Sequence, residues 1–198
     1  MSRASAAKPA DRRRTTILYA TLAVIVIAVV VGIALASRQV VPKAASEAPM
    51  QSKLKAGDKA PEFAVQTNAG PFDLAQVSTP VLLEVFATWC PHCQRETQVL
   101  NSLAAAYAGK VAIVAVSGSP QGIDGTTPES QADVNAFGAR FAVRYPLAFD
   151  PDLKVAQDYL QGGYPTLVLI KPDKTIAWVT SGEIPQADVA KQLDAVLR

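Results

Sequence analysis

Cysteine and histidine are scarce in this chain of 198 residues, which has two cysteines and one histidine. All three lie in one tetrapeptide, Cys90-Pro91-His92-Cys93. Two cysteines are too few for a disulfide framework, and the three residues together are too few for a four-ligand zinc site. We therefore expect no bound metal and no separate cofactor, and we interpret the clustered cysteines as a redox-active dithiol.

An excess of basic side chains is also lacking from most of the chain. The formal net charge is +2, but residues 1–16 hold five basic side chains and one acidic side chain. From residue 37 onward there are 14 basic and 16 acidic side chains. The positive excess belongs to a short N-terminal arm, so we expect the rest of the chain not to bind nucleic acid.

Charged residues are absent from the apolar stretch 17–36. At about 1.5 Å per residue, a helix of this length spans roughly 30 Å, the thickness of the hydrocarbon core of a bilayer. The stretch predicts a transmembrane signal anchor, and the arginines before it predict that residues 1–16 stay cytoplasmic while the remainder crosses the membrane. Cleavage after Ala36 is the alternative, although the stretch is longer than a usual signal-peptide core.

The segment after the anchor, residues 37–53, is rich in Ala, Ser, Pro, Gln and Lys and lacks apolar periodicity. This composition predicts a flexible tether. Residues 54–198 then form one folded domain. With or without cleavage, the domain lies on the periplasmic or cell-surface side of the cell membrane, where disulfide chemistry persists.

Apolar patterning in residues 54–198 predicts strands that alternate with helices. The run 81–86 is almost continuously apolar, as expected for a strand buried on both faces. The alternation indicates an α/β domain with a central, mostly parallel sheet covered on both sides, and with an antiparallel edge formed by the last two strands. We expect strands at 63–66, 72–74, 81–86, 111–116, 147–149, 166–170 and 175–180, and helices from the dithiol to residue 107 and at 133–143, 153–160 and 186–197.

The dithiol follows a buried strand and opens a helix. Cys90 at a helix N-terminus meets unpaired amide N–H groups and the positive end of the helix dipole, which stabilise a thiolate. Pro91 suits the first helical position, where its missing N–H has no consequence. His92 adds to the stabilisation when it is protonated or donates a hydrogen bond. Cys93 lies one turn deeper, so we assign Cys90 as the nucleophile and Cys93 as the resolving thiol.

Two alternatives to redox chemistry are open. A purely structural disulfide between Cys90 and Cys93 would close a four-residue loop and stabilise the fold little, because the gain grows with loop length. The domain could also be a non-catalytic module that binds a client peptide.

Three motifs resemble those of the TlpA/ResA-like thioredoxins. They are the stretch 81–96, VLLEVFATWCPHCQRE, the lead-in AGDKAPEF at 56–63, and GGYPT at 162–166 followed by LVLIKPD. The resemblance covers roughly residues 54–198. It implies a thioredoxin-like fold with a central mixed sheet flanked by helices, and a strand-helix insertion between residues 116 and 147.

The resemblance also implies roles for residues around the dithiol. Pro165 would follow a cis peptide bond in a loop that faces the cysteines. The backbone of Tyr164 in that loop would pair with an extended substrate peptide. Trp89 would form an apolar rim around Cys90, although ordinary packing would explain both aromatic residues without the family match.

Two carboxylates stand near the dithiol in the sequence. Glu84 lies six residues before Cys90 in the apolar strand, where thioredoxins often have a buried acid that exchanges a proton with Cys93. Glu96 lies six residues after Cys90, where ResA-like members have a glutamate near the cysteines. Alternatively, Glu84 is an inward-facing acid whose hydrogen bonds are made with groups other than the dithiol. Glu96 is alternatively a helix residue exposed to solvent.

The implied activity is that of a thiol-disulfide oxidoreductase acting on thiols and disulfides of exported or membrane-bound proteins. The TlpA/ResA architecture favours a reductase of the cytochrome c maturation type, supplied by a membrane electron donor. The Pro-His dipeptide between the cysteines is that of DsbA-type oxidants, so an oxidant is the alternative. A peroxidase is disfavoured because Ala87 stands where peroxiredoxins have a threonine.

Overall fold

The structure is a computed structural model that describes residues 16, 17, 19–29 and 52–198. The chain divides into two units, Met1–Ala48 and Pro49–Arg198, and each is described by itself. In the first unit, residues 16, 17 and 19–29 are helical and exposed. Among the residues described, no helix combines the length and the apolar character needed to cross a membrane.

The transmembrane helix expected at 17–36 is therefore not found in the described part of the chain. Residue 18 and residues 30–36 of that prediction lie outside the described residues. So do residues 1–15 of the expected basic arm and residues 37–51 of the expected tether.

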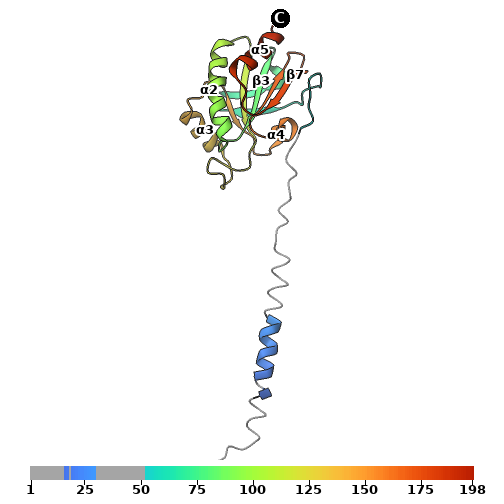
Figure 1. Cartoon of the computed structure of the whole chain (residues 1–198), viewed down its shortest axis with the longest axis vertical. Coiled ribbons are helices and arrows are strands. Elements are labelled where there is room, and N and C mark those ends of the chain that lie inside the picture. Colours follow the sequence, from blue (N-terminus) through green and yellow to red (C-terminus); the bar gives the residue numbers. More distant parts are fainter. Residues whose placement is uncertain (1–15, 18, 30–51) are drawn as a thin grey trace, which may run out of the picture. The chain divides into compact units, whose positions relative to one another are not determined.

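The second unit is built on a seven-stranded sheet with the strand order β2-β1-β5-β4-β3-β6-β7, shown with its helices in Figure 1. The seven strands and four α-helices match the sequence prediction, with ends that differ from it by a few residues, and the short 3-10 turn after β2 was not predicted. The strands are β1 Ala64–Thr67, β2 Gly70–Asp73, β3 Val81–Phe86, β4 Ala112–Ser117, β5 Leu147–Phe149, β6 Thr166–Ile170 and β7 Ile176–Ser181. The helices are the 3-10 turn η1 Leu74–Gln76, and α2 Pro91–Ala106, α3 Gln131–Arg140, α4 Lys154–Tyr159 and α5 Gln186–Val196.

Strand direction differs from the expectation of a mostly parallel sheet. Only β3 with β4 and β4 with β5 pair in parallel, while β1–β2, β1–β5, β3–β6 and β6–β7 are antiparallel. A parallel crossover needs a connection that returns along the whole length of a strand. The six-residue helix α4 rises only about 9 Å, so β6 enters beside β3 in the opposite direction. The sheet is mixed, as the family resemblance implied.

Apolar cores on both faces of the sheet explain the patterning of β3, all of whose residues are buried. Leu82 and Phe86 pack in the core that includes residues of α2, α3 and α5. Leu83 and Val85 pack in the other core, with residues of α4. Because side chains alternate along a strand, Glu84 points to the α2 face together with Leu82 and Phe86. The only charged residue of the strand therefore lies in the layer between the sheet and α2.

Candidate active site

The two cysteines lie at the start of α2, directly after the loop that leaves β3. Cys90 is the N-cap residue of the helix with an extended backbone, and Pro91 takes the first helical position. The backbone N–H of Cys90 donates to the carbonyl of Ala87 at 3.1 Å. Both cysteines are free thiols; Cys90 is 4% exposed and Cys93 is fully buried. The dithiol is more covered than the sequence suggested, with Cys93 the deeper of the two.

The loop before β6 faces the dithiol. The peptide bond between Tyr164 and Pro165 is cis, as the resemblance implied. The Cys90 Sγ donates to the carbonyl oxygen of Tyr164 at 3.6 Å. The Tyr164 hydroxyl donates to the carbonyl of Gly118 at 2.5 Å, which ties this loop to the end of β4. A Cβ on Gly118 would lie 2.4 Å from the Cβ of Ala156, so the chain here has no room for a larger residue.

Trp89 forms part of the surface beside Cys90. Its indole Nε1 donates to the Ser119 hydroxyl at 2.8 Å, and its ring packs edge-on against Tyr164 with centroids 5.9 Å apart. The residue is 37% exposed, which is high for a large apolar residue of the folded domain. An anchored aromatic ring with an exposed face suits contact with a partner peptide.

His92 points to the surface, where it meets two charged side chains. Its Nδ1 lies 3.1 Å from a carboxylate oxygen of Glu183 and 2.9 Å from a guanidinium nitrogen of Arg95, and Arg95 also pairs with Glu183. Arg95 can only donate and the carboxylate can only accept, so the ring nitrogen satisfies one of them at a time. The imidazole is therefore shared with this ion pair, not dedicated to Cys90.

The two thiols have opposite electrostatic environments. A hydrogen bond from the Cys93 thiol is the largest effect on Cys90, and with the N–H groups of Cys93 and His92 it lowers the pKa of Cys90 to about 6, against the opposing effect of burial. Burial is the main cause that raises the pKa of Cys93, followed by its hydrogen bond to Cys90 and the charge of Glu84. Cys90 is thus the thiolate and Cys93 a protonated thiol near neutral pH.

Both carboxylates singled out in the sequence are buried close to the cysteines. Glu84 is 2% exposed, and burial, followed by the charges of Glu96 and Cys90, raises its pKa well above the usual value. Glu96 is 1% exposed, so the interpretation as a solvated helix residue is wrong. Its Oε2 accepts from the backbone N–H of Ile184 at 3.2 Å. Burial nevertheless raises the pKa of Glu96 to about 7.

Sequence reasoning missed a third buried carboxylate, Glu129. It is 6% exposed and accepts hydrogen bonds from the hydroxyls of Thr88, at 2.5 Å, and Ser117. Burial raises its pKa, and these two bonds oppose the rise. Thr88 lies in the loop that leads to Cys90, so Glu129 holds that loop against the end of β4. Glu129 lies in a polar segment 41 residues from Thr88, and no local pattern marks such a contact.

Tyr145 was missed for a similar reason. It is 5% exposed and packs in the same core as Cys93. In the sequence it stands before a short strand, where a tyrosine is typical of ordinary packing.

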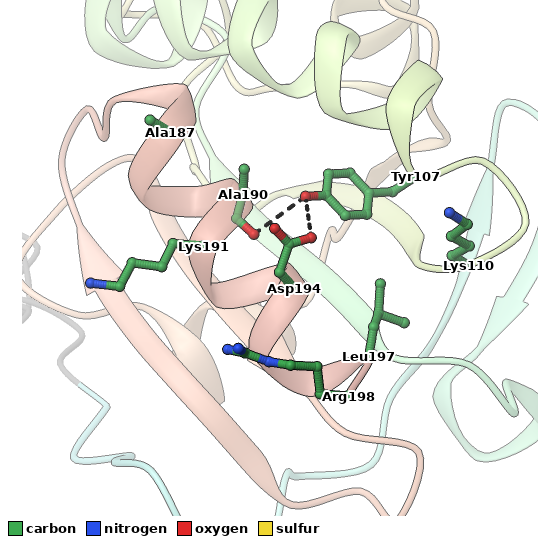
Figure 2. A pocket seen from close by; sticks show the side chains of 8 residues that line it. All are labelled: Tyr107, Lys110, Ala187, Ala190, Lys191, Asp194, Leu197 and Arg198. Carbon is green, nitrogen blue, oxygen red and sulfur yellow. Dashed lines mark hydrogen bonds between the residues drawn. The ribbon is translucent and has the colours of Figure 1, made fainter.

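One surface hollow lies along the first half of the helix α2, and another lies beyond its C-terminal end. The first, of about 330 Å³, is lined by Arg95, Glu96, Val99, Glu183, Ile184 and Pro185 and lies beside the buried acid Glu96. The other, of about 1190 Å³, lies between the end of α2 and α5. Figure 2 shows that the Tyr107 hydroxyl there bonds to Asp194 and to the carbonyl of Ala190. Tyr107 and Cys90 cap opposite ends of a 16-residue helix, about 24 Å apart, so the larger hollow is remote from the dithiol.

Comparison with known proteins places this geometry among thiol-disulfide exchange proteins. Residues 56–179 match the AhpC/TSA family. The chain is 27% identical over 143 residues to the thioredoxin-like protein YneN of Bacillus subtilis, covering 71% of this chain and 80% of YneN. It is 31% identical over 137 residues to the thiol-disulfide oxidoreductase ResA of Oceanobacillus iheyensis, covering 66% of this chain and 67% of ResA.

A solved structure agrees with these sequence matches. The crystal structure of a Chlorobium tepidum protein assigned as the thiol:disulfide interchange protein DsbE superposes with a TM-score of 0.64 at 28% identity. The match covers 73% of this chain and 99% of that protein. The thioredoxin-like fold expected from the sequence is therefore confirmed.

We predict that alkylation of Cys90 by iodoacetamide follows a titration with its midpoint near pH 6. The thiolate is the reactive form, so the rate rises with pH and about nine-tenths of Cys90 is reactive at pH 7. The variant Cys93→Ala removes the largest stabilising contact and should move the midpoint upward, whereas His92→Ala should move it less. A wild-type midpoint near 9, or a larger shift from His92→Ala than from Cys93→Ala, would contradict this assignment.

Proposed function

The chain belongs to the AhpC/TSA family as a TlpA/ResA-like thioredoxin, and from this premise we propose that it reduces disulfides in exported proteins. Its enzymatic class is thiol-disulfide oxidoreductase. The observation on which the proposal depends is a low-pKa Cys90 at the start of α2, with its sulfur against the carbonyl of Tyr164. Partner thiols and disulfides are the substrates.

In the first step the Cys90 thiolate attacks one sulfur of a substrate disulfide. The S–S bond of the substrate breaks, a mixed disulfide forms on Cys90, and one substrate thiolate leaves. We infer that the backbone of Tyr164, in the loop facing Cys90, pairs with an extended substrate segment, and that the exposed face of Trp89 contacts the side chains of that segment.

In the second step Cys93 loses its proton and attacks the sulfur of Cys90. The mixed disulfide breaks, the second substrate thiolate leaves, and the enzyme is left with a Cys90–Cys93 disulfide. Two electrons have passed from the enzyme dithiol to the substrate. The carboxylate of Glu84, whose charge affects Cys93 more than any other charge does, receives the proton. A donor dithiol protein at the membrane then restores the reduced enzyme.

The position of the Cys90 pKa supports the reducing direction. The active-site cysteine has a pKa of about 7 in thioredoxin and about 3.5 in DsbA. A value of about 6 is closer to that of thioredoxin, although the Pro-His dipeptide is shared with DsbA. Burial is the effect that opposes a more strongly stabilised Cys90 thiolate.

We predict that Glu84→Gln slows the resolving step on the order of a hundredfold at neutral pH, the lower end of the effect of general acid–base groups. The wild-type rate should rise with pH as Glu84 ionises, and the variant should lack this rise. Stopped-flow release of the second substrate thiol measures the step. Glu62→Gln, a change at an exposed carboxylate, is the matched control. Equal rates in wild type and Glu84→Gln would remove Glu84 from the mechanism.

The reduction potential of the dithiol tests the direction of electron flow. We expect a value nearer to about −270 mV, as in thioredoxin, than to about −120 mV, as in DsbA. Equilibration with glutathione or dithiothreitol buffers measures it, and mixed disulfides trapped by Cys93→Ala, identified by mass spectrometry, name the client. A potential near that of DsbA, with reduced client proteins in the trap, would assign an oxidant instead.

We further propose that the protein is anchored in the cell membrane with the dithiol on the periplasmic or cell-surface side. The support is the uncharged stretch 17–36 preceded by a cluster of arginines. An exported dithiol also fits the compartment in which protein disulfides persist.

The full chain should stay in the membrane fraction after alkaline carbonate extraction. In intact spheroplasts a membrane-impermeant thiol reagent should label the Cys90 thiolate, and Cys90→Ser should abolish the labelling because Cys93 is fully buried and burial raises the pKa of its thiol. Replacement of Arg12, Arg13 and Arg14 by Glu should reduce labelling, since the flanking positive charge sets orientation. Recovery of the protein in the soluble fraction, or labelling only after lysis, would refute the anchored topology.

A further inference from the structure

Three buried side-chain oxygens in the described part of the chain have no hydrogen-bond partner. They are Oε1 of Glu84, Oε1 of Glu96 and the hydroxyl of Tyr145. An unpaired buried polar group costs about 1–3 kcal/mol, and native proteins keep few of them. All three belong to residues near the same dithiol, so their shared position calls for a functional explanation.

The fold brings the three groups together from separate elements. Glu84 lies on the α2 face of β3, and Glu96 is a buried residue of α2. The register pairs Glu84 with Ala115 and Ala115 with Leu147. Tyr145 stands two residues before Leu147 and packs in the same core as Cys93 and Leu147. The tyrosine therefore enters the layer between α2 and the sheet from the side of β5.

The hydroxyl of Tyr145 is close to the carboxyl group of Glu84, and the charges of Glu84 and Glu96 both act on it. Its contact with Glu84 is outside the limits of a full hydrogen bond, but it is close enough to lower the pKa of Glu84 against the larger effect of burial. Burial raises the pKa of Tyr145, and the charges of Glu84 and Glu96 raise it further. The hydroxyl of Thr97 donates to the carbonyl of Cys93 at 3.0 Å. Thr97 also interacts with the Tyr145 hydroxyl, which lowers the pKa of Tyr145 against the larger effect of burial.

Glu96 connects this buried set with the surface. Its residue lines the hollow of about 330 Å³ beside α2, and Tyr145 lines a separate hollow of about 160 Å³ together with Arg144, whereas Glu84 lines neither. Charged and titratable groups surround the set. β3 contributes Glu84, and the start of α2 contributes Cys90, His92, Cys93, Arg95 and Glu96. The segment after β7 contributes Glu183, whose charge raises the pKa of Glu96.

We propose that Tyr145 is a positioning residue whose hydroxyl bridges Glu84 and Glu96, so that the proton leaving Cys93 reaches solvent through the hollow beside Arg95. The inference rests on the proposed function. Glu84 takes the proton from the Cys93 thiol and passes it to the Tyr145 oxygen as the tyrosine donates its own proton to Glu96. Glu96 then releases one proton to water. The electron pair stays on the Cys93 sulfur, which forms the bond to Cys90 as the substrate thiolate leaves.

Tyr145→Phe removes the bridging oxygen and keeps the ring that fills the core. We expect a melting temperature equal to or above that of wild type, because an unpaired buried hydroxyl is lost. We expect alkylation of Cys90 and formation of the mixed disulfide to be unchanged. The resolving step should slow about tenfold at pH 7, with the slowing diminishing at high pH as hydroxide removes the Cys93 proton directly.

Two further variants separate a relay from simple packing. Tyr159→Phe removes another buried hydroxyl, which donates to the carbonyl of Pro61 on the other face of the sheet, and it should leave the resolving rate and its pH profile unchanged. Glu96→Gln should slow the step as Tyr145→Phe does, and the double variant should be no slower than either single one, because members of one path are not additive.

A Tyr145→Phe enzyme that resolves at the wild-type rate at every pH, or a double variant in which the effects multiply, would overturn the relay alone. A wild-type protein that exchanges no disulfides would overturn the proposed function and the relay with it. Infrared difference spectra of oxidised and reduced wild type give a readout that does not need the variant to fold. The relay returns both acids to their starting protonation, but oxidation removes the Cys90 charge that raises the pKa of Glu84. The C=O band of Glu84 should therefore shift, the bridge should pass the shift to Glu96, and a shift in Glu84 alone would refute the bridge.

Discussion

The site depends on one constraint: the sulfur of Cys90 must hold a negative charge although protein covers almost all of it. Burial disfavours that charge because it removes the hydrogen bonds that water donates to an exposed thiolate. Nearby protein groups therefore have to donate these hydrogen bonds instead. The start of α2 meets this need with the thiol and N–H of Cys93 and the N–H of His92. The same hydrogen bond that stabilises the Cys90 thiolate holds the proton on Cys93. One contact thereby separates a nucleophile from a resolving thiol within a four-residue segment.

Protection of the dithiol creates a second requirement, because near neutral pH a fully buried thiol releases its proton to water only slowly. The carboxyl groups of Glu84 and Glu96 lie in the same layer, and burial raises the pKa of both toward the range in which they can accept and release protons. Three polar oxygens left without partners there lower stability. The unpaired oxygens thus lower the stability of the fold at the residues that we propose to exchange protons during the reaction. Such a cost is common at functional sites.

The sheet topology gathers the site from distant parts of the chain. β3 supplies Glu84 and leads to Cys90, while antiparallel β6 begins beside the end of β3 and places Tyr164 and Pro165 opposite the cysteines. Parallel β4 ends at the same edge, where Gly118 accepts from the Tyr164 hydroxyl and Ser117 bonds to Glu129. Had β6 run parallel to β3, its preceding loop would lie at the other end of the sheet and would not face the dithiol.

Local chemistry in the sequence was sufficient to determine the helix that starts at the dithiol, the order of strands and helices, the buried β3, and the roles open to Cys90 and Cys93. These follow from patterns of a few residues: Pro at a first helical position, an apolar run of strand length, and two thiols one turn apart. Strand direction, the burial of Glu96, and the positions of Glu129 and Tyr145 were decided only by tertiary structure. Each depends on contacts between segments tens of residues apart, and whether a polar side chain is solvated or buried is set by what packs over it, which no local pattern specifies.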